Sequence, residues 1–289
     1  MSGTVAILLA LHRSQGHLGE LLGSLSGQRY GDWALHAALD GEDDGTVAMV
    51  RAFVDKQPQQ TLLQAGPCRG FAANFLGLLS NVGPQEEFVA FCDHDDVWLP
   101  DKLVRAVRAL AQLSPSEPAL YASRSIVCDR RLSPIALSPQ PDLWRGFRGA
   151  LARSIASGNT MVLNRAGIEL LQQARADGGS PAFYDWWAYQ LVLGVGGNIV
   201  FDPTPSLLYR QHGRNVLGSS VTRQGKLRRL RAILNGDHRR WTSEQIDALR
   251  ASRHRLLPEN QQVLDQFRTP RPSRPMLRPG HAALPITEK

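Results

Sequence analysis

Short apolar runs alternate with stretches of helical periodicity through the first 113 residues of the chain. The apolar runs have the length of strands buried on both faces and lie at residues 5–11, 33–39, 61–64 and 87–92. Between them, apolar residues recur at helical spacing, as Leu18, Leu21, Leu22 and Leu25 do. This alternation predicts an α/β fold with a mostly parallel central sheet flanked by helices. Ligands of such folds bind at the carboxyl ends of the strands.

Acidic residues follow two of these predicted strands directly. Asp40 ends the second, and the segment FCDHDDVWLP (91–100) places Asp93, Asp95 and Asp96 after the fourth. Crowded carboxylates repel one another unless a divalent cation lies among them, and Mg²⁺ prefers one or two protein carboxylates completed by phosphate oxygens and water. The D-x-D spacing therefore predicts a metal site that neutralises a diphosphate. The alternative is a solvated acidic turn in which Asp96 caps the helix starting at Pro100.

The pattern loosens after residue 115. Strand-like runs lie at 119–127, 160–163, 198–201 and 207–210. Residues 183–193 have helical character, and the Pro- and Ser-rich segment 129–142 is typical of a loop.

The net charge of +7 belongs to the C-terminal part. Residues 1–217 hold 18 Lys and Arg against 20 Asp and Glu, whereas residues 218–289 hold 15 against 6. A basic segment either contacts an anionic surface or forms a solvated Arg-rich helix. Segment 226–234 (KLRRLRAIL) has a short amphipathic pattern, which suits the inner face of a membrane or packing on the main domain. From residue 268 the prolines and arginines predict a disordered tail.

Three kinds of sequence feature bear on the cellular compartment and the cofactor of the protein: membrane spans, signal peptides and cysteine motifs. No stretch approaches the roughly 18–20 apolar residues of a membrane span, and no basic signal-peptide region is found. Cys68, Cys92 and Cys128 are odd in number and form no CxxC pair, which favours neither a disulfide framework nor a zinc site. We expect a cytoplasmic protein, either free or peripheral at the inner face of the membrane.

Five segments, in the same order, resemble glycosyltransferase family 2, the inverting enzymes of GT-A fold, and its rhamnosyltransferase-like branch in particular. They are FCDHDDVWLPDKL (91–103), ALDGEDDGT (38–46), RGFAANF (69–75), SGNTMVLNR (157–165), and YDWWAYQL (184–191) followed by LLYRQHGRNVLG (207–218). The resemblance spans residues 5–217 and implies one GT-A domain over 1–217. Its donor half would cover about 1–115 and its acceptor half about 116–217. A helical basic extension (218–267) and a disordered tail (268–289) would follow.

The resemblance implies a metal-dependent inverting transfer. A sugar, with rhamnose a candidate, would pass from a dTDP- or UDP-linked donor to a hydroxyl of a glycan or lipid-linked acceptor. By family position Asp185 is the general base. A carboxylate beside two tryptophans is partly desolvated, which raises its pKa toward that of a useful base. The alternative is that Asp185 only caps its helix.

Metal and donor contacts follow from the same resemblance. Mg²⁺ or Mn²⁺ would bind Asp93, Asp95 and Asp96, with His212 completing the shell, although Asp96 could instead hold its neighbours. The donor would contact Asp40, Arg69, Asn74, Asp93 and Arg210. Two departures leave the nucleotide base open: Leu39 replaces a second aspartate, and LALHR (9–13) replaces the family's proline-threonine-tyrosine-asparagine run.

Two other functional classes share some of these features. A sugar nucleotidyltransferase of related fold would carry a Gly-rich phosphate loop after the first strand, and LALHRSQGHL has one glycine and one arginine there. A non-catalytic binder would act through the basic tail on an anionic surface or nucleic acid. Because Trp241 is the only aromatic residue in the basic run, no nucleic-acid partner is expected.

Overall fold

A computed structural model of the whole chain describes residues 3–57, 59–141, 146–155, 157–212, 227, 230–231 and 234–267. The predicted tail at 268–289 lies outside these residues, as does most of the amphipathic segment 226–234. The boundary between a domain ending at 217 and a basic extension therefore stays a prediction.

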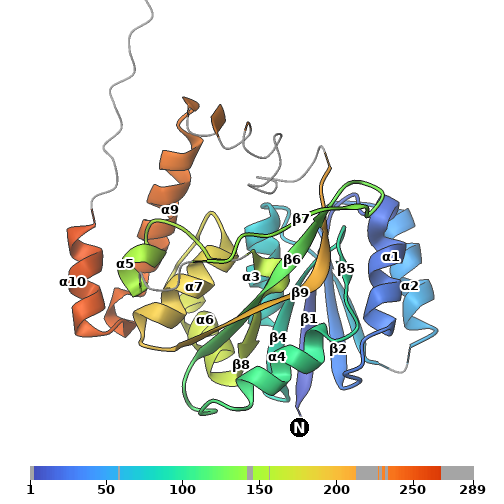
Figure 1. Cartoon of the computed structure of the whole chain (residues 1–289), viewed down its shortest axis with the longest axis horizontal. Helices are drawn as coiled ribbons and strands as arrows, with labels where there is room; N and C mark the ends of the chain where they lie inside the picture. Colours follow the sequence, from blue (N-terminus) through green and yellow to red (C-terminus); the bar gives the residue numbers. More distant parts are fainter. Residues whose placement is uncertain are drawn as a thin grey trace, which may run out of the picture.

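The first part of the chain builds a parallel sheet, as its alternation predicts. The strands are β1 (Thr4–Leu11), β2 (Trp33–Leu39), β3 (Thr61–Ala65) and β4 (Glu86–Asp93). β1 lies between β4 and β2 (Figure 1) and pairs in parallel with both, while β3 pairs in parallel with β2. The register sets Leu11 beside Leu39 and Ala10 beside Asp93, so these strands end together.

The second part extends the same sheet with mixed directions. Its strands are β5 (Val97–Trp98), β6 (Ala119–Cys128), β7 (Pro134–Leu137), β8 (Val162–Asn164) and β9 (Asn198–Arg210). In the described chain the order is β3-β2-β1-β4-β8-β6-β9-β5, with β7 beside β6. β8 is antiparallel to β4 and β6, while β6 and β9 are parallel. The predicted α/β fold with helices around a central sheet is confirmed, and its parallel part lies within residues 1–115, the predicted donor half.

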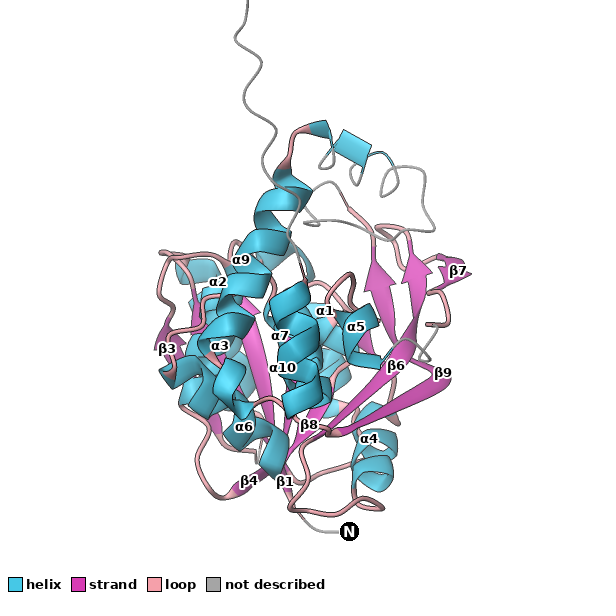
Figure 2. Cartoon of the chain, turned by 90° about the vertical axis from the view of Figure 1, so that its left-hand side faces the viewer, coloured by secondary structure: helices cyan, strands magenta, loops and turns pink. Residues whose placement is uncertain are grey.

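Helices cover both faces of the sheet. They are α1 (Gln15–Ser26), α2 (Asp44–Val54), α3 (Phe71–Ser80), α4 (Lys102–Leu110), α5 (Gly146–Ala150), α6 (Arg165–Ala176), α7 (Tyr184–Gly194), α9 (Asp237–Ala251) and α10 (Pro258–Gln266), with 3₁₀ turns η2 (Gly158–Thr160) and η3 (Arg253–Arg255). Figure 2 shows α3, α6, α7, α9 and α10 gathered on one side.

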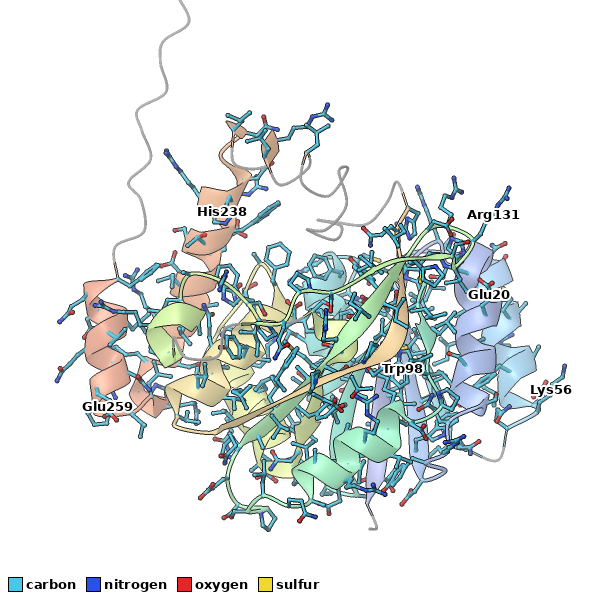
Figure 3. The ribbon with its side chains drawn as sticks, viewed as in Figure 1. Glu20, Lys56, Trp98, Arg131, His238 and Glu259 are labelled. Atoms are coloured by element: carbon cyan, nitrogen blue, oxygen red, sulfur yellow. The ribbon has the colours of Figure 1, made fainter. Side chains whose placement is uncertain are left out.

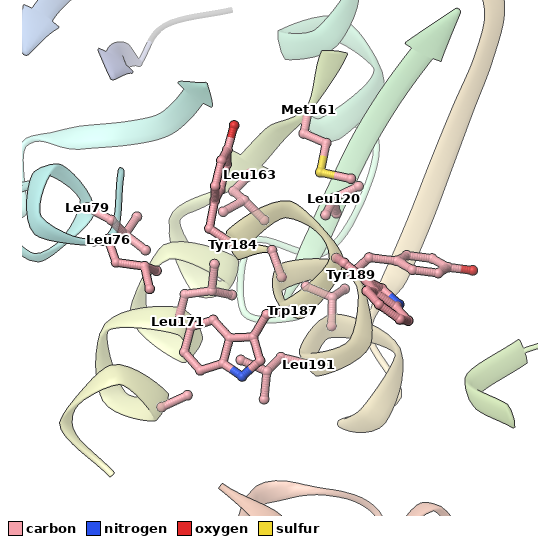
Figure 4. Close-up of a cluster of buried hydrophobic side chains, with 14 of the residues drawn as sticks. Leu76, Leu79, Leu120, Met161, Leu163, Leu171, Tyr184, Trp187, Tyr189 and Leu191 are labelled. Atoms are coloured by element: carbon pink, nitrogen blue, oxygen red, sulfur yellow. The ribbon is translucent and has the colours of Figure 1, made fainter. Parts of the chain in front are cut away.

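Two apolar cores follow from the alternation of side chains along the central strands. Leu8 of β1 belongs to the core beneath α3, α6, α7 and α9, part of which Figure 4 shows around Trp187 and Leu171. Leu9, its neighbour, belongs to the core beneath α1, α2 and α4. Because each strand contributes to both cores, the carboxyl ends of β1, β2 and β4 are held on a rigid base.

Three details of the second half differ from the sequence interpretation. Helix α6 was not predicted, and β7 lies inside the predicted loop 129–142. The two strands expected at 198–201 and 207–210 are one strand, β9. Its partner jumps from Asp202 to Pro205 where β6 passes from Ser123 to Arg124, so a bulge accommodates Pro203 and Pro205 within the strand.

Candidate active site

A cleft of about 1740 Å³ opens at the carboxyl ends of β1, β2 and β4, where ligands of α/β folds bind. Of the residues singled out from the sequence, Asp40, Asn74, Asp93, Asp95, Asp185 and His212 line it. Arg69, Asp96 and Arg210 are not among the lining residues. The fold therefore brings together side chains from segments more than a hundred residues apart.

Asp40 is held at the end of β2 by its neighbours. Its Oδ1 accepts a hydrogen bond of 3.0 Å from the Cys68 backbone N–H, and its backbone carbonyl lies 3.0 Å from His12 Nδ1. A Cβ at Gly66 would overlap the Asp40 carboxylate. A glycine at position 66 is thus required for this orientation of Asp40.

Asn74 is a buried amide in the first turns of α3 with one unused acceptor. Its side chain is 2% exposed, and Nδ2 donates to the Ala38 carbonyl at 3.1 Å. Its Oδ1 has no hydrogen-bond partner in the described structure, although Asn74 lines the cleft. A buried acceptor without a donor is rare and costly, which favours a ligand contact here. Arg69, by contrast, is exposed beside the rim residues Cys68 and Gly70.

In the acidic loop (residues 93–96), Asp93 and Asp95 line the cleft. His212 Nε2 hydrogen-bonds to Asp95 Oδ2 at 2.6 Å, and the His212 ring stacks on His17 with centroids 5.7 Å apart. Burial opposes ionisation of Asp95, but the His212 hydrogen bond and the charge of His94 outweigh it and lower its pKa. Burial and the charges of Asp95 and Asp185 raise the pKa of Asp93. A cation between these groups would relieve that repulsion.

Asp96 points away from the cleft and is fully buried. Its Oδ1 accepts from the Arg210 backbone N–H at 3.2 Å, and its Oδ2 accepts from Asn159 Nδ2. Burial, followed by the charges of Asp95 and Asp93, raises its pKa well above the usual range. Both oxygens of Asp96 are thus used to join the acidic loop to β9 and η2.

Arg210 is also turned inward, with 2% of its surface exposed. Its Nε donates to the Asp95 carbonyl at 2.9 Å and its Nη1 to the Arg130 carbonyl at 2.7 Å, while Nη2 pairs with Glu20. The guanidinium therefore supports the backbone of the acidic loop instead of facing the cleft.

Lys102 belongs to this arrangement, although the sequence analysis assigned it no role. It is fully buried, donates from Nζ to the Asn159 carbonyl at 2.7 Å, and lies 4.6 Å from the centroid of the Trp98 ring. Burial lowers its pKa to about 7. Figure 3 shows Trp98 in the interior of the molecule. The signal was present, because both residues stand in the W-x-P-x-K part of the acidic segment. We call Asp96, Lys102, Asn159 and Arg210 the buried seam.

Asp185 lies in the first turn of α7 and lines the same cleft. Its Oδ2 accepts from the Gly158 N–H at 3.0 Å and its Oδ1 from the Trp186 N–H at 2.8 Å. Burial raises its pKa, and these two hydrogen bonds limit the rise. The carboxylate is therefore oriented by the backbone next to Asn159, while it faces the cleft.

The start of α7 is itself clamped by a residue from α9. Gln245 is fully buried; its Oε1 accepts from the Phe183 N–H and its Nε2 donates to the Phe183 carbonyl, both at 3.2 Å. Its Nε2 also lies 3.2 Å from Gln190 Oε1. Nothing in the local sequence distinguishes Gln245 from a surface glutamine, so sequence reasoning missed it.

Within the described chain, no three His, Cys, Asp or Glu side chains are grouped so that they could hold a metal by themselves. The cleft instead offers the two carboxylates of Asp93 and Asp95, with the His212 imidazole hydrogen-bonded to Asp95. One or two protein carboxylates suit Mg²⁺, which completes its shell with phosphate oxygens and water. No helix of the described part is long and apolar enough to cross a membrane.

Comparisons with known proteins agree with this architecture. Residues 6–116 match the sequence model of glycosyl transferase family 2. The dTDP-rhamnosyl transferase RfbG of Shigella flexneri is 24% identical over 250 residues, which are 83% of this chain and 84% of that protein.

Solved structures share the fold at low identity. TarS residues 1–349 of S. aureus superpose with a TM-score of 0.56 at 14% identity, covering 90% of this chain and 83% of that one. The mannosyltransferase PcManGT of Pyrobaculum calidifontis, solved with GDP-Man and Mn²⁺, gives 0.55 at 17% identity, covering 90% and 78%. These matches point to a glycosyltransferase rather than to a sugar nucleotidyltransferase or a binder that acts through the basic tail. The chain is therefore a glycosyltransferase of GT-A fold whose residues 6–116 match the family 2 model and which is similar to a dTDP-rhamnosyl transferase.

Proposed function

We propose that this glycosyltransferase moves a sugar, rhamnose being the first to test, from a dTDP- or UDP-linked donor to a hydroxyl of a glycan or lipid-linked acceptor, with inversion. The observation that carries the proposal is that Asp93 and Asp95, at the end of β4, and Asp185, at the start of α7, line the same cleft. The similarity to a dTDP-rhamnosyl transferase supports the choice of donor.

The nucleotide would bind over the ends of β1 and β2. Asp40, oriented by Cys68, can accept the imide N–H of thymine or uracil. The unpartnered Oδ1 of Asn74 can accept a hydrogen bond from an N–H or O–H group of the nucleotide. Arg69 can approach the phosphates of the nucleotide from the rim of the cleft.

Mg²⁺ or Mn²⁺ would be held by Asp95 and Asp93, with His212 beside them, and when bound it neutralises the charge of the diphosphate. PcManGT was solved in complex with Mn²⁺, which supports this cofactor class. Asp96 and Arg210, which the resemblance implied as a metal ligand and a donor contact, are here assigned to positioning the acidic loop. Both oxygens of Asp96 bond within the buried seam, and the Arg210 guanidinium bonds to the Asp95 and Arg130 carbonyls and to Glu20.

Asp185 acts as the general base. Its carboxylate takes the proton of the acceptor hydroxyl while that oxygen forms a bond to the anomeric carbon. The bond from this carbon to the diphosphate oxygen breaks, and its electron pair leaves with the diphosphate. Attack from the side opposite the leaving group inverts the configuration. The raised pKa of Asp185 suits proton abstraction better than that of a solvated aspartate.

Peripheral contact with an anionic membrane is part of the proposal, and nucleic acid is not a partner. Leu227, Leu230 and Leu234 are 48%, 51% and 75% exposed, and Arg231 beside them is exposed too. Exposed leucines next to arginines suit the boundary of an anionic bilayer, where lipid-linked acceptors lie.

The test separates metal binding from base catalysis. Calorimetry with dTDP and UDP, with and without Mn²⁺, is compared for the wild type, Asp95→Asn and Asp185→Asn. We expect the wild type to bind a nucleotide only with Mn²⁺ and Asp95→Asn to lose the Mn²⁺-dependent gain. Asp185→Asn should bind as the wild type does and transfer about 10³-fold more slowly.

Two results would contradict these roles. Equal nucleotide affinity with and without Mn²⁺ in the wild type removes the metal assignment. Undiminished transfer by Asp185→Asn removes Asp185 as the base.

A further inference from the structure

Three aromatic side chains from separate segments stand together in the cleft near Asp185. Phe71 begins α3, Phe183 precedes α7 and Trp241 lies on α9. The Phe183 ring lies 5.3 Å from the Trp241 ring, at 85°, and 5.8 Å from the Phe71 ring, measured between centroids. All three residues line the cleft. We call them the aromatic wall.

The aromatic wall is not sealed into the apolar core. Phe71 is 37% exposed, and Phe183 and Trp241 are only half-buried. Removing aromatic surface from water is favourable, so rings left open in a concave site are available to a ligand. Pockets that bind small molecules are typically lined in this way, with a few polar groups beside the rings.

Polar side chains line the same cleft as the aromatic wall. His238 and Thr242 reach the cleft from α9, and Arg153 and Ser157 reach it from the segment around η2. Figure 3 shows His238 projecting from α9. A groove for a lipid chain would need a longer continuous apolar surface. Rings with a polar rim match a pyranose, whose C–H faces are apolar and whose hydroxyls lie around its edge.

The wall is held in place by the clamp that holds α7. Trp241 and Gln245 are four residues apart, so they lie on the same side of α9. Gln245 binds both backbone groups of Phe183, and Ile246 and Leu249 anchor α9 in the core with no exposed surface. Since Phe183 is two residues before Asp185, the wall and the carboxylate keep a constant relative position.

We propose that the aromatic wall is an acceptor subsite that binds one pyranose ring of a carbohydrate acceptor and selects which acceptor is used. It rests on the proposed function, in which Asp185 deprotonates that acceptor. Trp241 lies outside residues 6–116, so acceptor choice is placed on a helix beyond the matched family 2 domain.

Saturation-transfer NMR with a panel of methyl pyranosides of hexoses, deoxyhexoses and N-acetylhexosamines tests the proposal, with farnesol as the lipid probe. Nucleoside diphosphate and Mn²⁺ are present throughout. The proteins are the wild type, Trp241→Leu, which has no ring, and Trp241→Phe, which keeps one. Arg240→Ala is the matched control, because Arg240 is an exposed neighbour on α9 that is not among the lining residues.

We expect at least one pyranoside to bind Arg240→Ala as tightly as it binds the wild type. Its affinity for Trp241→Phe should lie within about twofold of the wild-type affinity, and its affinity for Trp241→Leu should be at least about fivefold lower. The proposal is overturned if no pyranoside binds the wild type, if Trp241→Leu binds as well as Trp241→Phe, or if farnesol binds and the sugars do not. Calorimetry of nucleotide and Mn²⁺ on the same proteins keeps the tests distinct. If the wild type binds the nucleotide with Mn²⁺ but binds no sugar, only the acceptor-subsite proposal is refuted. If the wild type shows no Mn²⁺-dependent nucleotide binding, the proposed function is refuted.

Discussion

The two halves of the cleft position their side chains by different means. In the proposed donor half, Asp40 and Asp93 stand at the ends of parallel strands, and the ladder of β2, β1 and β4 sets where they lie. In the proposed acceptor half, Asp185 is oriented by the Gly158 N–H, and the start of its helix is clamped by Gln245. Many backbone hydrogen bonds fix the position of the strand ends, whereas the start of α7 depends on the hydrogen bonds of one side chain, Gln245. The acceptor half should therefore be the more sensitive to single substitutions.

The buried seam is where the two halves meet. Asp96 from the donor half bonds to Asn159 and to the Arg210 backbone from the acceptor half, and Lys102 bonds to the Asn159 carbonyl. Asn159 is next to Gly158, whose N–H orients Asp185. The seam thus connects the acidic loop to the backbone that orients Asp185.

The largest effect is expected from breaking the seam. Asp96→Ala leaves the Asn159 amide and the Arg210 N–H buried without an acceptor and Lys102 without its nearby carboxylate. We expect the free energy of unfolding to fall by about 3–5 kcal/mol in urea denaturation. Asp95→Ala, whose carboxylate faces the cleft, should lose only about 1 kcal/mol. Equal losses in the two variants would mean that Asp96 is not the structural member of the acidic loop.

Removing the clamp should damage one half only. Gln245→Ala leaves the N–H of Phe183 without a partner and its carbonyl with only the Trp187 N–H, which costs about 2 kcal/mol of unfolding free energy. Because Asp185 follows two residues later, transfer should slow while Mn²⁺-dependent nucleotide affinity stays unchanged. The control is Glu244→Ala, at a 46% exposed side chain on the same helix. A parallel loss of nucleotide affinity in Gln245→Ala would show that the two halves are not independent.

The smallest effect concerns how the final helices dock on α6. Arg255 of η3 donates to both oxygens of Asp177, at 2.6 and 2.9 Å, and this hydrogen bonding lowers the pKa of Asp177. A carboxyl whose pKa is lower in the folded state stabilises the fold above its unfolded pKa of about 3.9, and the contribution is lost as pH falls through the folded value. Asp177→Asn should therefore lose about 1 kcal/mol at pH 7.

That difference should shrink below about pH 4, because the wild-type carboxyl then becomes protonated. Urea denaturation of both proteins from pH 7 to pH 3 measures it. A difference that stays constant over this range would assign the loss to packing rather than to the Asp177–Arg255 ion pair.

Sequence reasoning was accurate where structure is local. Apart from the short β5, the strands and helices of residues 4–110 follow from hydrophobic periodicity, and their strand ends predicted where the cleft opens. In the second half the two strands predicted at 198–201 and 207–210 are one strand with a bulge, and α6 was missed. There, partners distant in sequence decide the local structure, so local patterns carry less information.

The sequence by itself determined the fold class and the wall of the cleft that carries the carboxylates, because buried strands and the residues that end them are encoded over a few neighbouring positions. Only the tertiary structure decided how the acidic residues divide their work. Asp95 meets His212 across 117 positions, and Asp96 meets the Arg210 N–H across 114. Neighbouring aspartates of one loop point in opposite directions, and the register of β9 and the placement of η2 select which one faces the cleft. The same holds for Gln245 and Trp241, whose roles depend on α9 packing against α7.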